Sequence, residues 1–343
     1  MNLQKILIIF LFTTLLACAE GGTGGTGAII APPPTPTLVT GHASKGPLRS
    51  GSAVTVNRLS EDGSVAELLT QELISTDTGK FSFEVDNDEV VIIQTVGQYF
   101  SEITGTHQNT ITLSAIANIS ESNEIFNTNL LTTLTSPRIQ KLMSEGMAVA
   151  SAISTAESEL ITALKPILPA ASTTSRFTNL LVINRLQQTS NQENNAYLLA
   201  ASSIFDQLAQ TQAKSNNDTI AKNMINIITL LSNELAISGQ LNDHNLMAEL
   251  VTAMTELNPD QVLLNLYRLD TDLQTPTAIN NLSACEVLIG ELTCAGNSEQ
   301  NQDVTSHIAD LNRFLDSDKD GILNNLDTDD DDDGIPDLED TRP

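Results

Sequence analysis

The most concentrated chemistry in this sequence lies in an aspartate-rich segment, residues 316–343. Counted from Asp316 as position one, oxygen-bearing side chains occupy positions one, three, five, nine and twelve, with glycine at six and isoleucine at seven. The pattern repeats thirteen residues later, starting from Asp329. At these offsets a twelve-residue loop supplies carboxylate and backbone carbonyl oxygens to a calcium ion, and the glycine permits a sharp turn. The predicted ligands are Asp316, Asp318, Asp320, Ile322 (through its carbonyl), Asn324 and Asp327 in the first loop, and Asp329, Asp331, Asp333, Ile335 (through its carbonyl), Asp337 and Asp340 in the second.

Electrostatics favour a cation in this segment, and calcium is the best fit. Two carboxylates about 5 Å apart repel by roughly 3 kcal/mol at an effective dielectric constant near 20, so the crowded carboxylates cannot fold compactly without cations. Calcium accepts six to eight oxygen ligands in a flexible geometry, whereas magnesium requires a stricter octahedron and zinc prefers nitrogen or sulfur. A solvated acidic tail is the alternative, but it leaves the two in-phase glycines, each followed by isoleucine, unexplained.

The two loops are too close together for an EF-hand pair or a dockerin module, because Thr328 alone separates them and Pro336 interrupts any helix in the second. Their spacing resembles thrombospondin type 3 repeats, in which successive Asp-rich loops wrap around calcium ions with almost no other core. This sequence departs from the pattern in two ways: Asn324 removes one charge from the first loop, and Asp330 and Asp332 add carboxylates off the pattern.

The first residues have the features of an export signal. Lys5 precedes an apolar run, Ile6 to Leu16, that is too short to span a bilayer. The run ends in Leu15-Leu16-Ala17-Cys18, which resembles the lipobox of bacterial lipoproteins. The resemblance implies cleavage before Cys18 and acylation of its thiol, and Ala19 in place of aspartate implies sorting to the outer membrane. The alternative is an ordinary secretory signal with an incidental cysteine.

A glycine-rich stretch, residues 21–27, and the proline-rich residues 32–36 follow Cys18 and predict a spacer from the membrane. A phosphate-binding loop is disfavoured because no Gly-Lys-Ser/Thr follows the glycines. The other two cysteines, Cys285 and Cys294, predict a disulfide in an oxidising compartment. A two-cysteine metal site is the competing interpretation, but it lacks a nearby histidine.

Residues 38–114 contain short runs of alternating residues, such as 53–56 and 81–85, and the β-branched run 90–93, separated by turns at Asp62-Gly63 and Thr78-Gly79. They predict a small antiparallel β-sandwich. The segments 41–56 and 76–83 resemble the carboxypeptidase-regulatory-like, transthyretin-type sandwich of bacterial surface proteins. That resemblance implies a spacer or ligand-presenting module and no catalytic residue.

Residues 115–284 change to apolar residues three and four apart, for example Met224, Ile227 and Leu231, and predict a bundle of five to seven helices. Ser136-Pro137 and Asn258-Pro259 are predicted helix starts, and Gly239 is a predicted helix end. The apolar stripes, including several methionines, could also line a cofactor groove or a partner face, but core packing is the simpler interpretation.

The sequence therefore predicts a multidomain α and β protein: a small antiparallel β-sandwich, an α-helical bundle domain and an irregular Asp-rich calcium-binding tail. The predicted segments are a lipoprotein signal peptide (1–17), a tether (18–37), the sandwich (38–114), the helical domain (115–284), a disulfide loop and connector (285–315) and the calcium-binding repeat (316–343).

The net charge of −27 argues against nucleic acid as a partner, because phosphate binding requires clustered Lys and Arg. The four histidines are scattered, and neither an HExxH zinc motif nor a GxSxG elbow occurs. We therefore expect a non-catalytic scaffold, anchored by lipid to the outer membrane on its periplasmic or surface face, that binds calcium and a protein or glycan ligand. An envelope enzyme with its active site in the helical domain is the alternative. A third hypothesis is that the tail is a handle for export or docking.

Overall fold

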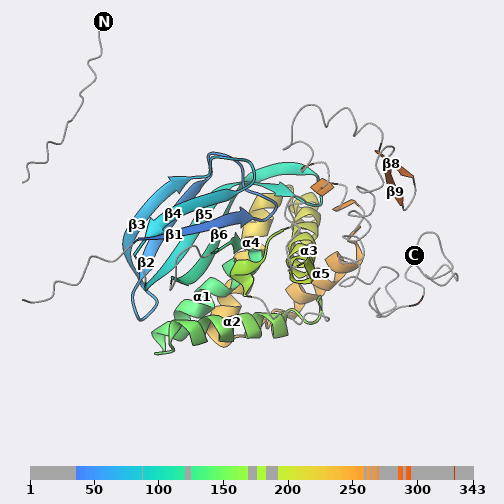
Figure 1. The fold of residues 1–343 in the computed structure, drawn as a ribbon. Coiled ribbons are helices and arrows are strands. Elements are labelled where there is room, and N and C mark those ends of the chain that lie inside the picture. Colours follow the sequence, from blue (N-terminus) through green and yellow to red (C-terminus); the bar gives the residue numbers. More distant parts are fainter. Residues whose placement is uncertain are drawn as a thin grey trace, which may run out of the picture. The chain divides into compact units, whose positions relative to one another are not determined.

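The structure is a computed structural model that describes residues 36–86, 88–119, 125–168, 176–182, 192–258, 261–262, 265–266 and 269, the strands at 285–288 and 291–294, and Thr328. It has mixed α and β content (Figure 1). Within the described ranges, seven strands come first along the chain and five α-helices follow, as the sequence pattern predicts, and two short strands come last.

Alternating apolar and polar residues form the main strands. In β4 (Lys80–Val85), Phe81, Phe83 and Val85 are buried and the residues between them are exposed. The other strands of the sheet are β1 (Thr37–Ser44), β2 (Ala53–Leu59), β3 (Val65–Leu73), β5 (Glu89–Ser101), β6 (Thr106–Ile119) and β7 (Thr128–Asn129). The predicted turn at Asp62-Gly63 joins β2 to β3, where Gly63 adopts the left-handed conformation (φ 78°) that glycine tolerates best.

These seven strands form one sheet in the order β3-β2-β5-β6-β7-β1-β4. Strands β3 and β4, at opposite ends of this order, also approach each other, so the sheet nearly closes on itself. All neighbouring pairs are antiparallel except β1 and β7, which pair in parallel through Ala43 and Ser44.

Strand β6 runs to Ile119, beyond the strand-to-helix boundary expected at residue 114. Residues 113–117 near its end are buried on both faces: Ala117 belongs to the main core, whereas Ile116 packs with Ile139 of helix α1 in a second cluster. A strand buried on both faces loses the period-two alternation that identifies it in a sequence.

The helices are α1 (Leu130–Ser144), α2 (Val149–Ala163), α3 (Gln192–Asn216), α4 (Ile220–Ser238) and α5 (His244–Thr255), with a short 3-10 helix η1 (Phe177–Asn179). The predicted end of α4 at Gly239 is confirmed, since Gly239 is its C-cap with φ 69°. At the predicted start at Asn258, the side chain accepts a hydrogen bond from the amide of Gln261 (2.9 Å), as an N-cap does.

The predicted helix start at Ser136-Pro137 is wrong, because Pro137 lies inside α1. The helix begins instead after Asn129, whose side chain forms a reciprocal capping box with Thr132. Proline lacks an amide hydrogen, so one intrahelical bond is missing at Pro137. Packing of α1 on the sheet and on α4 outweighs this local cost.

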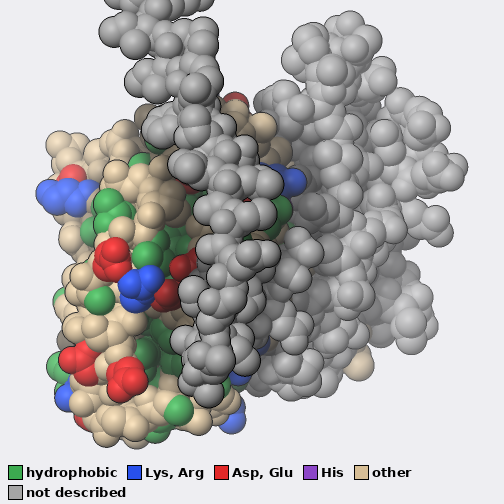
Figure 2. Space-filling model, turned by 60° about the vertical axis from the view of Figure 1, so that its left-hand side comes forward, with side chains coloured by type: hydrophobic (Ala, Val, Ile, Leu, Met, Phe, Trp, Pro, Cys, Tyr) green, Lys and Arg blue, Asp and Glu red, His purple; other side chains and the backbone are tan. Residues whose placement is uncertain are grey.

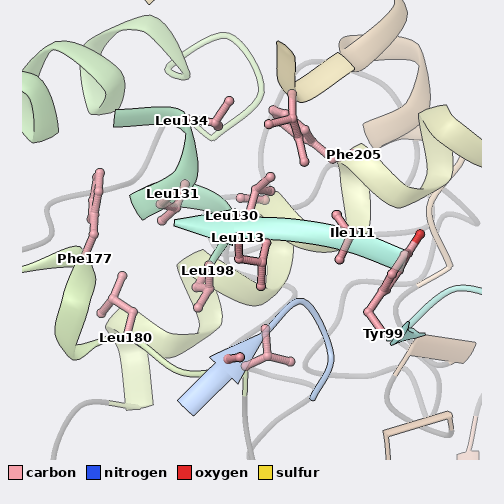
Figure 3. Close-up of a cluster of buried hydrophobic side chains, with 14 of the residues drawn as sticks. Tyr99, Ile111, Leu113, Leu130, Leu131, Leu134, Phe177, Leu180, Leu198 and Phe205 are labelled. Carbon is pink, nitrogen blue, oxygen red and sulfur yellow. The ribbon is translucent and has the colours of Figure 1, made fainter. Parts of the chain in front are cut away.

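One continuous apolar core joins the sheet and the helices. Figure 3 shows Leu113 of β6 close to Leu130 of α1, with Ile111 farther along β6 toward Tyr99; these residues and Phe205 of α3 belong to the same cluster. In Figure 1 the helices α3, α4 and α5 lie together on the side of the sheet away from β3. In the described part of the chain, the sheet and the helices thus pack on shared apolar side chains, and polar groups between them become buried.

The outermost strand, β3, carries exposed apolar side chains, namely Val65, Leu68 and Leu73. On the face shown in Figure 2, apolar side chains are interspersed with charged ones instead of forming one large patch. No helix among the described residues has the length and apolar character needed to cross a membrane.

Candidate functional site

Most of the site residues predicted from the sequence lie outside the described residues. These are Cys18 and all the proposed calcium ligands between Asp316 and Asp340; only Thr328, between the two loops, is described there. Lipidation and calcium binding therefore stay predictions.

Cys285 and Cys294 are described through their backbone. They lie on β8 (Cys285–Leu288) and β9 (Glu291–Cys294), which pair as an antiparallel hairpin with Cys285 directly opposite Cys294. Directly opposed residues of an antiparallel pair have Cα atoms about 4.5–5.5 Å apart, a separation that a disulfide can bridge. The register is compatible with the predicted disulfide, which itself stays a prediction.

Among the described residues, the most deeply buried ion pairs are those of Lys45 with Glu102 and Asp206, a group that we call the ionic cluster. All three side chains have an exposed fraction of 0%. The Lys45 Nζ atom lies 2.6 Å from Glu102 Oε2 and 3.7 Å from Asp206 Oδ2. One ammonium group thus faces two carboxyl groups away from solvent, an arrangement that sequence analysis did not predict.

Lys45 is placed by the turn that follows β1. Gly46, with φ 56°, packs so closely on β5 that a Cβ atom there would lie 2.1 Å from the carbonyl oxygen of Phe100. Leu48 then forms an isolated β-bridge with Tyr99. The turn is thereby fixed on the end of β5, and the Lys45 ammonium lies 5.2 Å from the centre of the Tyr99 ring, a cation–π distance.

Glu102 follows β5 directly and is held by two other parts of the chain. Its Oε1 atom accepts a hydrogen bond from Ser202 Oγ of α3 (2.8 Å). Its backbone carbonyl accepts one from Asn265 Nδ2 (2.9 Å), which also donates to the carbonyl of Ile103 (3.0 Å). Gly105 completes this contact, since a Cβ atom there would lie 2.6 Å from Asn265 Oδ1.

Asp206 reaches the cluster from α3. Its Oδ2 atom is hydrogen bonded to Ser101 Oγ (2.5 Å), and its Oδ1 atom accepts from the Tyr99 hydroxyl (3.3 Å). Burial raises the pKa of Asp206; Lys45 opposes this rise and the negative charge of Glu102 adds to it. Burial, followed by the carboxylates of Asp206 and Glu102, also raises the pKa of Tyr99, so its hydroxyl stays protonated and can donate.

The cluster brings an amine, two carboxyl groups and hydroxyl donors together away from the solvent-exposed surface. With Asp206 in its acid form, Lys45 and Glu102 balance each other in charge, which lowers the large cost of burying an unpaired ion. No side chain of the ionic cluster is exposed, so a dissolved substrate has no direct access to it. Among the described residues, no group of three or more His, Cys, Asp or Glu side chains could hold a metal ion.

A signal for one member of the cluster is present in the sequence. Asp206 lies within the apolar stripe of Ile204, Phe205 and Leu208, where an acid facing a core needs a buried partner. Its partners are about a hundred residues away or more along the chain, so the sequence alone does not identify them.

Comparison of the chain with protein-family models, with curated proteins and with solved structures finds no match in any of the three.

Proposed function

We propose that this chain is a non-catalytic scaffold of the bacterial cell envelope, anchored by lipid at Cys18 and binding calcium through residues 316–340. The observation that carries the proposal is the pair of in-phase Asp-rich loops, starting at Asp316 and Asp329. Each loop offers carboxylate oxygens at the offsets that calcium uses, with a glycine at the turn. The location that we propose is the outer membrane, on its periplasmic or surface face.

The packing of the described strands and helices supports a scaffold. The sheet and the helices share one core, and the ionic cluster ties β1, β5 and α3 together through buried polar contacts. Glu102 and Asp206 have no exposed surface, so acid–base chemistry on a dissolved substrate would require the packing of β5 on α3 to open. These features suit a body that holds its shape while another segment binds.

The other predicted features complete this proposal. We propose that the sheet acts as a spacer or ligand-presenting module, the role of the regulatory-like sandwich that residues 41–83 resemble. A Cys285–Cys294 disulfide would close the β8–β9 hairpin, which in the sequence lies after the helices and before the Asp-rich segment. The ligand that we expect is a protein or glycan at the cell surface.

Isothermal titration of calcium into the chain from Ala19 onward tests the calcium site. Modules of this kind bind with dissociation constants of about 0.1–1 mM, so heat is expected in the millimolar range. Changing Asp318, Asp320, Asp331 and Asp333 to Ala should abolish that heat, because it removes two ligands from each loop.

The matched control is the double variant Asp330→Ala and Asp332→Ala, which removes carboxylates from the same segment at positions off the pattern. We expect it to retain binding, with an affinity reduced only by the weaker negative potential. Equal loss of the binding heat in both variants would indicate that calcium associates as a diffuse counter-ion cloud and is not held by specific ligands. No heat with the unaltered chain at millimolar calcium would refute the calcium site.

A further inference from the structure

The ionic cluster holds the two reactants of a condensation, an amine and a carboxylic acid, in a dry environment. The Lys45 Nζ atom lies 3.7 Å from Asp206 Oδ2, so the amine and the carboxyl group whose carbon it would attack are direct neighbours. Fixed neighbours of this kind react with effective concentrations far above those in solution. All three side chains are fully buried, so water does not dilute or hydrate them.

We propose that Lys45 and Asp206 become joined by an intramolecular amide bond, an isopeptide cross-link, with Glu102 carrying the protons. Lys45 comes from the turn after β1, and Asp206 comes from α3. The bond therefore fastens the sheet covalently to the helical layer. It goes beyond the proposed function, because it concerns the body of the protein and is independent of calcium and lipid.

Glu102 is positioned to act as the base. Its Oε2 atom accepts a hydrogen bond from Lys45 Nζ (2.6 Å), and transfer of the proton along this bond gives a neutral amine and a neutral acid. Such a transfer removes two charges from a low-dielectric interior, where separate ions are costly. Ser202 Oγ, hydrogen bonded to Glu102 Oε1 (2.8 Å), fixes the orientation of the carboxyl group.

Asp206 is positioned to act as the electrophile. Burial raises the pKa of this carboxyl group, which favours the acid form that can lose hydroxide as water. The hydroxyls of Tyr99 and Ser101 contact its two oxygens and can stabilise negative charge that develops on oxygen during attack. The lone pair of the neutral Lys45 amine attacks the carboxyl carbon of Asp206.

The step balances without any other reagent. The Lys45 nitrogen forms a bond to the Asp206 carboxyl carbon, and the carbon–oxygen bond to the hydroxyl group breaks. Glu102 takes a proton from the attacking nitrogen and delivers one to the departing hydroxyl, which leaves as water. Starting from an ammonium, a carboxylate and an acid, the products are an amide, a neutral Glu102 and one water molecule. No oxidant, nucleotide or metal is needed, and no buried charge remains.

Peptide mapping of the full chain, extracted in detergent and digested with trypsin under denaturing conditions, tests the bond directly. Trypsin cleaves after a free lysine but not after one converted to an amide. We expect the peptide that ends at Arg49 to retain Lys45 uncleaved and to be joined to the peptide 186–214, with the mass of one water molecule missing. Lys222, which pairs with Asp218 on the surface, is the internal control and should be cleaved normally.

Each outcome of the digest decides the proposal. The joined peptide in the majority of molecules supports it. A linear 186–214 peptide in the majority of molecules, with cleavage after Lys45, overturns it and leaves a simple buried ion pair. Joining of Lys45 to the peptide 81–138, which contains Glu102, would overturn the assignment of Asp206 as the acceptor.

Two variants separate the roles of the residues. Glu102→Gln keeps the shape of the side chain but cannot accept the Lys45 proton, so the joined peptide should disappear while the circular dichroism spectrum is retained. Asp206→Asn keeps an acceptor that releases ammonia instead of water. The joined peptide should therefore form with the mass of one ammonia molecule missing. An unchanged amount of joined peptide in Glu102→Gln would refute Glu102 as the proton carrier. The digest of the unaltered chain shows whether the cross-link exists, even if a variant fails to fold.

Discussion

The ion pair between Arg138 and Glu159 should be worth a measurable part of the stability of the folded body. Arg138 Nε and Nη2 each lie 2.7 Å from an oxygen of Glu159, and Nη1 donates to the carbonyl of Ala236 (3.2 Å). One guanidinium group on α1 therefore connects α2 and α4. The exposed fractions are 11% for the Arg138 side chain and 24% for that of Glu159, so the pair is largely but not fully buried.

Arg138→Met keeps the aliphatic part of the side chain and removes the charged group. Removing one partner of a fully buried pair costs about 3–5 kcal/mol, whereas an exposed pair contributes about 0–1 kcal/mol. Because the Glu159 carboxylate can be partly rehydrated, we expect the free energy of unfolding to fall by about 2 kcal/mol, between those limits. Urea denaturation followed by circular dichroism measures this change.

A double-mutant cycle with Glu159→Gln isolates the interaction, and its coupling energy should be about 1–2 kcal/mol. Lys141→Met is the matched control: Lys141 lies on the same helix and pairs with Glu145 at 3.0 Å, but both side chains are about half exposed. The control should change stability by less than about 0.5 kcal/mol. Equal effects of the two substitutions, or a coupling energy near zero, would refute the reasoning from burial.

Three further predictions test the packing. Gly41→Ala should destabilise the fold by more than about 2 kcal/mol in urea denaturation, because a Cβ atom would lie 2.0 Å from the backbone oxygen of Phe126; unchanged stability would contradict the close approach. Asn129→Ala should lower the free energy of unfolding by about 2–3 kcal/mol, because it removes the helix cap and a buried donor to the Phe177 carbonyl. Asn129→Asp should retain the cap but still lack that donor. Burial raises the pKa of Glu157, so its contribution to stability is present below the unfolded-state pKa and is lost as pH rises through the folded-state pKa. Glu157→Gln should therefore gain stability relative to the unaltered chain as the pH rises above about 4.5, the ordinary pKa of glutamate, and parallel pH profiles would refute this.

Local patterns predict those parts of the fold in which one face is buried and the other exposed. The alternation in residues 81–85 predicts β4, and the three- and four-residue spacing around Met224 predicts α4. Gly239 marks the end of α4, because few other residues adopt its left-handed conformation without strain. In each case the signal lies within a few residues of the element that it predicts.

The predictions that differ from the structure concern positions where tertiary packing outweighs local preference. Ile116 and Ala117 are both buried, on opposite faces of β6, so the strand shows no alternation at its end. Pro137 suggests a helix start, yet α1 continues through it. The contacts that decide both positions come from residues distant in sequence, which a local window does not contain.

The two candidate sites also differ in whether their residues are close in sequence or are brought together by tertiary packing, and this determines how each can be found. The proposed calcium ligands are close in sequence, and repeated spacing alone identifies them. Lys45, Glu102 and Asp206 each look ordinary in the sequence: Lys45 and Glu102 directly follow strands, and Asp206 interrupts an apolar stripe. The three side chains meet only when β1, β5 and α3 pack together. This packing places the Lys45 amine next to both carboxyl groups, and the burial that results raises the pKa of Asp206. Reactivity of such a cluster is therefore a consequence of folding, so a cross-link between Lys45 and Asp206 should form only in chains that have reached the packed state.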